Sequence, residues 1–207
     1  MTGGLALTAV VAWGVASSPS FIQALAANRL LFFALIIGEL ALVWFLSARI
    51  LSLSPGAAAG GFAAYALLNG ITLSVIFLAF TGAQIAKALA VTAGTFAGMS
   101  LYAVTTKRDL ARFGSYLIYG LWGLIIASLV NLFLRSGVLD WALSYIGVLL
   151  FLGLTAYDTQ IIRRWSLQLG DSVAEADFVR ISVLGALKLY LDFVNLFLFF
   201  LRLFGRR

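Results

Sequence analysis

The stretch ALKLYLDFVNLFLFFLRLF, residues 186–204, decides the fold, because it is long and apolar enough to cross a lipid bilayer. Asp192 lies at its midpoint. A carboxylate at the centre of a bilayer costs at least about 3 kcal/mol, so one that is retained there indicates a functional site. Asp192 is therefore the first candidate for a functional residue.

The composition excludes a soluble globular domain. Hydrophobic residues make up 63% of the chain, charged residues only 11%, and the mean hydropathy is +1.06. The apolar runs show no dyad alternation, which favours helices over a β-barrel. We predict an all-α polytopic membrane protein, a seven-transmembrane-helix bundle in which residues 1–207 form a single transmembrane domain. The predicted spans are residues 5–18, 30–48, 56–80, 84–105, 113–134, 141–162 and 178–204.

Basic residues cluster at the ends of the predicted spans, so the net charge of +6 indicates membrane topology and not a nucleic-acid partner. The positive-inside rule places the even-numbered connections, and with them the amino terminus, in the cytoplasm, although Arg202, Arg206 and Arg207 argue against an external carboxyl terminus. The lipid bilayer is the partner that the sequence indicates most directly. The basic residues of the even-numbered connections are Arg49, Lys107, Arg108, Arg112, Arg163 and Arg164.

The chain contains neither cysteine nor histidine. Disulfides, thiolate metal sites, histidine-based nucleophilic catalysis and the HExxH zinc site are therefore excluded. No GxxxxGK[ST] phosphate loop occurs either. We expect no enzymatic activity and no cofactor, and we expect any transported solute to move down its own gradient.

Polar residues of the last span lie on one face of the predicted helix. They recur at spacings of three, four, three and seven residues, while the other faces are Leu, Phe and Val. A polar stripe in an apolar helix is placed against protein or a wet cavity, not against lipid. The last helix is therefore predicted to be central in the bundle. The stripe consists of Gly185, Lys188, Asp192, Asn195 and Arg202.

Two other spans carry a carboxylate that solvent does not explain. Glu39 lies in the middle of LIIGELALVWF, and Asp158 lies about one turn from the end of the sixth span, in LGLTAYDTQII. Tyr65, Asn69 and Thr72 share a face of the third span. The remaining acids fall in loops or at helix ends, where solvent accounts for them: Asp109, Asp140, Asp171, Glu175 and Asp177.

The three carboxylates within the spans have two interpretations. They either lock helices together as neutralised pairs, for which Lys188 is one turn from Asp192, or they line a path for cations. Hard oxygen ligands suit calcium or protons, and calcium takes about six to eight oxygens. With Asn69, Asn195 and water the carboxylates provide these oxygens only loosely, which favours weak, transient calcium binding and a leak.

The segments LYLDFVNLFLFFLRLFG in the last span and AYDTQ in the sixth, with the glutamate in the second, resemble the Bax inhibitor-1 family, the transmembrane Bax-inhibitor-motif proteins. The resemblance covers essentially the whole chain. It implies a seven-helix fold with the last helix central and a pH-sensitive calcium leak across the membrane. For a bacterial member of the family, it implies an integral protein of the inner (plasma) membrane.

The resemblance also implies roles for individual residues. Asp158 and Asp192 are expected to form a hydrogen-bonded carboxyl pair that acts as the proton sensor, and Glu39 is expected in the ion path. Arg49 is the nearest match to an arginine that pairs with Asp158 when the path is closed. Lys188 departs from the family pattern, so either the sensor responds at lower pH than in relatives or Lys188 points away from it.

Two other classes of function stay open. The chain could be a non-conducting interaction protein that regulates a membrane protease or a cell-death factor, or it could be a proton-coupled cation carrier. Small-residue spacings, Gly94 with Gly98 and Gly56 with Gly60, permit close helix contact. Internal packing is the expected use of these glycines.

Overall fold

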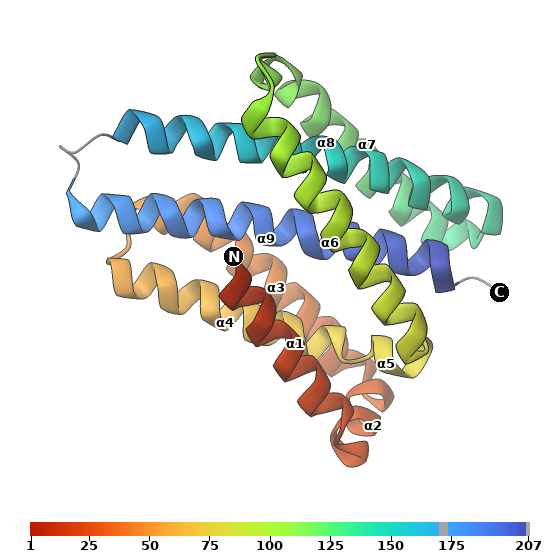
Figure 1. Ribbon diagram of the computed structural model, residues 1–207. Coiled ribbons are helices and arrows are strands. Elements are labelled where there is room, and N and C mark those ends of the chain that lie inside the picture. Colours follow the sequence, from red (N-terminus) through yellow and green to blue (C-terminus); the bar gives the residue numbers. More distant parts are fainter. Residues whose placement is uncertain (170–173, 206–207) are drawn as a thin grey trace. The chain divides into compact units, whose positions relative to one another are not determined.

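A computed structural model describes residues 1–169 and 174–205, and its regular elements are helices (Figure 1). These are, in chain order, α1 (Thr2–Ala16), α2 (Pro19–Ala27), α3 (Arg29–Arg49), the 3-10 turn η1 (Ile50–Ser52), α4 (Pro55–Leu73), α5 (Ile76–Ala79), α6 (Gly82–Thr105), the 3-10 turn η2 (Leu110–Phe113), α7 (Gly114–Leu134), α8 (Gly137–Leu169) and α9 (Glu175–Gly205).

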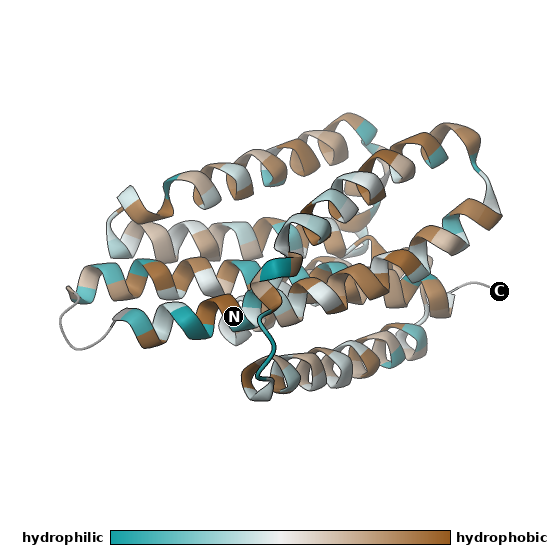
Figure 2. Cartoon of the chain, turned by 90° about the horizontal axis from the view of Figure 1, so that it is seen from above, coloured by the Kyte–Doolittle hydropathy of each residue, from teal (hydrophilic) through white to brown (hydrophobic). Residues whose placement is uncertain are grey.

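The described residues contain six helices long and apolar enough to cross a membrane, and a seventh span if α1 and α2 together count as one. Apolar residues run along all of these helices (Figure 2). The prediction of an all-helical polytopic membrane protein is thereby confirmed. The six spans are Arg29–Ser52, Pro55–Ala79, Gly82–Thr105, Leu110–Leu134, Gly137–Gln168 and Glu175–Gly205.

The first predicted span is broken. Pro19 begins α2, and the residue before it, Ser18, is extended (φ −105°, ψ 98°), as expected before a proline. The chain bends by 100° there. By itself α1 has 15 residues and a length of about 22 Å, which is less than the roughly 30 Å of the hydrocarbon core.

The chain divides into two compact units, Met1–Thr81 with Leu169–Tyr190 (unit 1) and Gly82–Gln168 with Leu191–Arg207 (unit 2). Both units take part of α9, so neither is a separate stretch of chain. The single domain over residues 1–207 stays a prediction. Half of an 18-residue apolar segment of α9 is buried, against a third at most in the other spans, so α9 is the most buried of the six spans.

In unit 1, α1 and α3 pack against α4, and α1 approaches α4 closely at Gly70. A Cβ at Gly70 would lie 2.8 Å from the backbone oxygen of Thr8, so only glycine allows this contact. The four glycines that the sequence assigned to packing behave differently. A Cβ at any of them would meet none of the described atoms within 4 Å, so the prediction of internal packing is wrong for Gly56, Gly60, Gly94 and Gly98.

In unit 2, aromatic rings of α9 fill the core. Phe193 packs edge-on against Phe96 of α6, with ring centroids 5.4 Å apart, and Phe199 packs against Phe151 of α8. The helices α8 and α9 have 33 and 31 residues, or about 50 and 46 Å, so both exceed the hydrocarbon thickness. The sequence placed their ends near residues 162 and 178, several residues short of the observed helix ends.

Candidate functional site

Glu39 of α3 is bound by two side chains of α4. Its Oε1 accepts a hydrogen bond from Thr72 Oγ1 (2.6 Å), and its Oε2 accepts one from Asn69 Nδ2 (3.2 Å). The side chain is buried, with 9% exposed. The structure therefore brings together two residues predicted for the ion path, Glu39 and Asn69, and adds the hydroxyl of Thr72.

Sequence reasoning missed the continuation of this cluster through Tyr190 and Thr8. Tyr190 of α9 donates to Asn69 Oδ1 (3.0 Å), and its hydroxyl lies 2.6 Å from Thr8 Oγ1. Thr8 of α1 donates to the carbonyl of Ala66 (2.8 Å). The signal was the tyrosine in LYLD and a lone threonine in an otherwise apolar run. We call Glu39, Thr72, Asn69, Tyr190 and Thr8 the Glu39 network.

Asp158 of α8 and Asp192 of α9 both belong to unit 2 and are almost fully buried, with 6% and 4% exposed. Their burial agrees with the prediction that neither carboxylate is a surface residue. Two residues after Asp158, Gln160 binds the connection between α6 and α7. The position of Asp158 along α8 is thus tied to that connection.

The other predicted site residues are more loosely held. Asn195 is half-buried in unit 2, and its Nδ2 donates to the carbonyl of Leu191 in its own helix (2.8 Å). Lys188 is half-buried, one turn before Asp192 on α9. Arg49 is exposed at the end of α3 in unit 1, whereas Asp158 lies in unit 2, so their closed-state ion pair stays a prediction.

Metal binding has no preformed centre in the part of the chain that the structure describes. No group of three acidic side chains is close enough there to hold an ion. Of the carboxylates expected to bind calcium weakly, Glu39 belongs to unit 1, and Asp158 and Asp192 belong to unit 2. Transient calcium binding by them stays a prediction.

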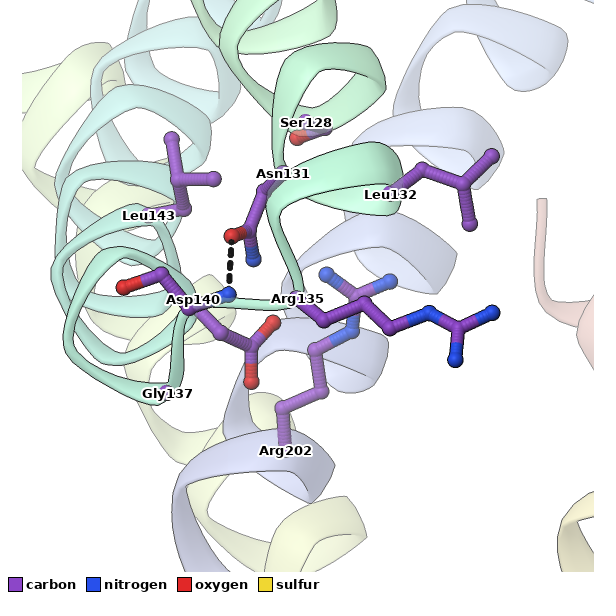
Figure 3. Close-up of a pocket in the computed structure, with 9 residues that line it drawn as sticks. Ser128, Asn131, Leu132, Arg135, Gly137, Asp140, Leu143 and Arg202 are labelled. Atoms are coloured by element: carbon purple, nitrogen blue, oxygen red, sulfur yellow. Dashed lines mark hydrogen bonds between the residues drawn. The ribbon is translucent and has the colours of Figure 1, made fainter.

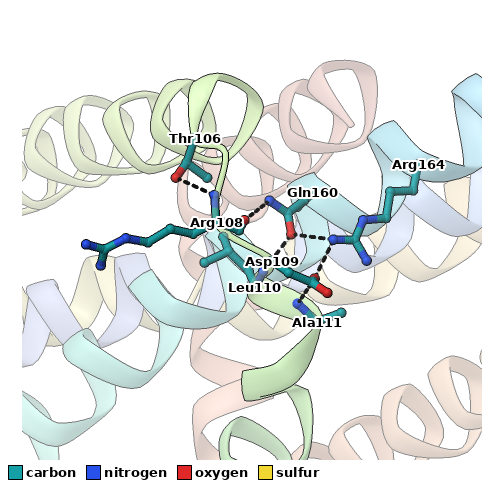
Figure 4. Close-up of polar contacts among 7 residues, drawn as sticks. All are labelled: Thr106, Arg108, Asp109, Leu110, Ala111, Gln160 and Arg164. Atoms are coloured by element: carbon teal, nitrogen blue, oxygen red, sulfur yellow. Dashed lines mark hydrogen bonds and ion pairs between the residues drawn. The ribbon is translucent and has the colours of Figure 1, made fainter.

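A polar network ties the α6–α7 connection to α8 (Figure 4). Gln160 accepts from the N–H of Leu110 (2.8 Å) and donates to the carbonyl of Arg108 (2.9 Å). Arg164 forms an ion pair with Asp109 and also donates to Gln160. Asp109 is exposed, as the sequence predicted for an acid in a loop, and the ion pair adds to its contact with solvent.

The ion pair keeps Asp109 ionised. The hydrogen bond from Arg164, followed by that from the backbone N–H of Ala111, holds the pKa of Asp109 below its usual value. Asp109 lies between the spans that end at Thr105 and begin at Leu110, where water has access. Asp177 is similarly paired with Arg180 (2.7 Å) and is exposed, as the sequence predicted.

A second polar region of unit 2 lies where α7 turns into α8. A cavity of about 480 Å³ is lined by Arg135, Asp140 and Arg202, among others (Figure 3). The N–H of Ser136 donates to Asn131 Oδ1 (3.0 Å) in its wall. Arg135 ends α7 in the left-handed conformation (φ 50°). Of the stripe predicted on α9, Arg202 thus reaches this cavity.

Comparison with known proteins identifies relatives along the entire chain. The family model described as "Inhibitor of apoptosis-promoting Bax1" matches residues 1–207. Inner membrane protein YbhL of Escherichia coli (strain K12) is 51% identical over 207 residues, which are 100% of this chain and 88% of that protein. Uncharacterized proteins of Borreliella burgdorferi and Deinococcus radiodurans are each 44% identical over all of this chain, covering 88% and 87% of their own lengths.

The family match extends over the whole chain, and the identities come from alignments that cover all of this chain and 87% or 88% of each relative. The motifs in α8 and α9 resemble the same family, and the structure supplies the apolar helices of a polytopic membrane protein. The chain therefore belongs to the family of inhibitors of apoptosis-promoting Bax1, the Bax inhibitor-1 family.

Proposed function

We propose that this protein is a pH-sensitive calcium leak channel of a bacterial inner membrane, in which Asp158 and Asp192 form a di-aspartyl proton sensor. Membership in the Bax inhibitor-1 family supports the activity class. The relative YbhL carries the name of an inner membrane protein, which supports the location. The positive-inside rule supports a cytoplasmic amino terminus.

The observation that carries the proposal is the burial of two aspartates on the two longest helices of the chain, within one unit. Two buried carboxylates close together cannot both ionise cheaply, so such a pair titrates as one unit. The chain has no histidine, which leaves a carboxyl pair as its simplest sensor near neutral pH. Gain or loss of a proton by the pair shifts α8 against α9 and so gates the path.

Oxygen ligands elsewhere supply the path for the ion. Glu39 and Asn69 present buried side-chain oxygens in unit 1, and Asn195 lies one turn after Asp192 on α9. Calcium prefers carboxylate and amide oxygens, and a small number of them gives the weak binding that a leak requires. Such a path conducts calcium down its gradient without ATP.

Calcium flux into liposomes tests this proposal. We expect entry of calcium, followed with an indicator inside vesicles that contain the purified protein, to change with pH for the wild type. Asp158→Asn and Asp192→Asn should each remove the pH dependence, because a neutral amide cannot exchange the proton. Asp177→Asn is the matched control, since Asp177 is an exposed acid on the same helix as Asp192 and should leave the profile unchanged.

A non-conducting regulator of other membrane proteins is the second candidate. Its specific support is the open space around Gly56, Gly60, Gly94 and Gly98 in the described structure, because small residues on a helix face permit another transmembrane helix to approach. That function predicts no calcium entry at any pH and a partner that copurifies in mild detergent. A proton-coupled carrier would differ from a leak channel in one respect: a proton gradient alone would drive calcium uptake against the calcium gradient.

A further inference from the structure

We propose that Glu39 is a proton-binding site in its own right, in which one bound proton reverses the direction of the hydrogen-bond chain Glu39–Asn69–Tyr190–Thr8. This site lies in unit 1 and does not involve the two aspartates of unit 2. Its existence does not depend on whether the protein conducts calcium.

The argument begins with the number of protons available to Thr8 and Tyr190. Three close contacts involve their hydroxyl oxygens: Thr8 with the carbonyl of Ala66 (2.8 Å), Thr8 with Tyr190 (2.6 Å), and Tyr190 with the amide of Asn69 (3.0 Å). Each hydroxyl has one hydrogen, and the carbonyl has none. If Asn69 presents its oxygen to Tyr190, three contacts share two hydrogens, and one pair of oxygens is left without a hydrogen between them.

The opposite orientation of the Asn69 amide removes this deficit. Its NH₂ then donates to Tyr190, Tyr190 donates to Thr8, and Thr8 donates to Ala66, so every contact contains a hydrogen. The two orientations of an amide differ only in which atom is nitrogen and which is oxygen, and the hydrogen-bond network decides between them.

The opposite orientation of the Asn69 amide changes the atom that faces the Glu39 carboxylate. Asn69 would then present its oxygen to Glu39 Oε2, 3.2 Å away, and two acceptors would face each other unless Glu39 carries a proton. A proton taken from water onto Oε2 supplies the missing hydrogen bond, and no other covalent bond changes. Ionised Glu39 therefore goes with the amide orientation that leaves one contact without a hydrogen. Protonated Glu39 goes with the orientation in which every contact contains a hydrogen.

Among the residues that the structure describes, Glu39 forms no ion pair, and the positive charges of residues 1–81 are the amino group of Met1 and the side chains of Arg29 and Arg49. Glu39 is the only acid in residues 1–81, and α1, α2, η1 and α4 contain no charged side chain. On α3 itself, Arg29 and Arg49 are each ten residues away, at its two ends. The titratable groups that sense the charge of Glu39 are Tyr65 on α4 and Tyr190 on α9.

The α9 segment of unit 1 also carries charged side chains. Glu175, Asp177 and Arg180 lie in the first two turns of α9, and Lys188 lies two residues before Tyr190. Because Tyr190 is a hydrogen-bond partner of both Asn69 and Thr8, the proton on Glu39 also decides how firmly α1 is held.

Infrared difference spectroscopy tests this site in the purified full-length protein. The chain has only two glutamates, Glu39 and the exposed Glu175, so a ¹³C label in the glutamate carboxyl separates their signals from those of all aspartates. We expect a protonated glutamate C=O band in the wild type whose intensity titrates with pH. This band should be absent in Glu39→Gln and present in Asp158→Asn and Asp192→Asn.

Two variants test the chain while leaving Glu39 in place. Thr8→Val and Tyr190→Phe each remove one hydroxyl of the Thr8–Tyr190 contact, which lacks a hydrogen when Glu39 is ionised. Ionisation of Glu39 therefore becomes more favourable in both variants. The midpoint of the glutamate band should fall by about half to one pH unit in each. Thr92→Val is the matched control, because Thr92 is a fully buried threonine on α6 in unit 2 that bonds the carbonyl of Ala88, and the midpoint should not move.

Absence of a titrating glutamate band in the folded wild type would overturn the inference. So would midpoints in Thr8→Val and Tyr190→Phe that equal the midpoint in Thr92→Val. A flat calcium-flux profile would count against the proposed channel and leave this result untouched, so the two proposals fail separately.

Discussion

The two units use buried carboxylates in different settings. In unit 1 the buried carboxylate of Glu39 accepts hydrogen bonds from the neutral side chains of Asn69 and Thr72, and the Glu39 network runs from α3 through α4 to α9 and α1. In unit 2 two aspartates are buried, Asp158 on α8 and Asp192 on α9, and basic residues line the cavities near the α7–α8 turn and the α6–α7 connection. The hydrogen bonds of the Glu39 network join four helices, whereas two buried acids that lie close together are expected to titrate as one unit.

The largest expected contrast concerns how closely helices approach in the two units. A Cβ at Gly70 would lie 2.8 Å from a backbone oxygen, whereas at Gly153 in unit 2 the nearest atom, at 2.9 Å, is the end of the Leu117 side chain. The backbone of Thr8 cannot move away from an added methyl group, whereas the Leu117 side chain can change its conformation. We expect Gly70→Ala to cost about 2–3 kcal/mol of stability and Gly153→Ala less than about 1 kcal/mol.

Unfolding of the reconstituted variants in a denaturing-detergent titration measures this contrast. Gly60→Ala is the control on α4, because its Cβ would meet none of the described atoms within 4 Å and alanine favours the helix by roughly 0.5–1 kcal/mol. Equal losses for Gly70→Ala and Gly153→Ala would show that α1 can move away from α4, and the rigid contact in unit 1 would be wrong.

The second contrast compares two asparagines. Asn69 joins Glu39 to Tyr190, whereas Asn195 donates within its own helix. We expect Asn69→Ala to cost about 1–3 kcal/mol because it leaves buried polar groups without partners, and Asn195→Ala to cost less than about 1 kcal/mol. Thermal unfolding in the same detergent provides the measurement. A larger loss for Asn195→Ala would mean that polar bonding matters more in unit 2.

The smallest effect is expected at the exposed ion pair of unit 2. The pKa of Asp109 is lowered by Arg164, so the pair stabilises the folded state above the ordinary aspartate pKa, and this contribution disappears as the pH falls through the lowered value. Arg164→Gln should therefore lower the melting temperature slightly at neutral pH and not at all in strong acid. A difference that persists in acid would assign the effect of Arg164 to its bond with Gln160 instead.

Much of the fold follows from hydropathy alone, because each span must be long and apolar to exist in lipid. Six of the seven predicted spans and the burial of the last helix were visible in the sequence, whereas the sharp bend before Pro19 was not predicted. The ends of α8 and α9 were not, since polar residues such as Arg163 and Arg164 continue a helix beyond the apolar core without interruption. Hydropathy marks where a helix leaves the membrane, but it does not show where the helix itself ends.

The candidate site was partly predictable for a similar reason. A charge in an apolar run stands out, so the burial of Glu39, Asp158 and Asp192 was predicted correctly. A hydroxyl does not stand out, so Tyr190 and Thr8 were missed although they complete the Glu39 network. The prediction that Gly56 and Gly60 pack against another helix was wrong, because spacing shows where small residues lie but not which of them meets a neighbouring helix. The close contact with α1 is made by Gly70, which the sequence analysis did not single out.

A double-variant comparison of calcium flux tests the central claim most directly, namely that Asp158 and Asp192 act as one proton-binding unit. If the two aspartates form one coupled sensor, Asp158→Asn, Asp192→Asn and the double variant should show the same flat dependence of calcium flux on pH, because removing either acid already abolishes the pair. Separate partial losses that add up in the double variant, or a profile that stays like the wild type in all three, would contradict the account.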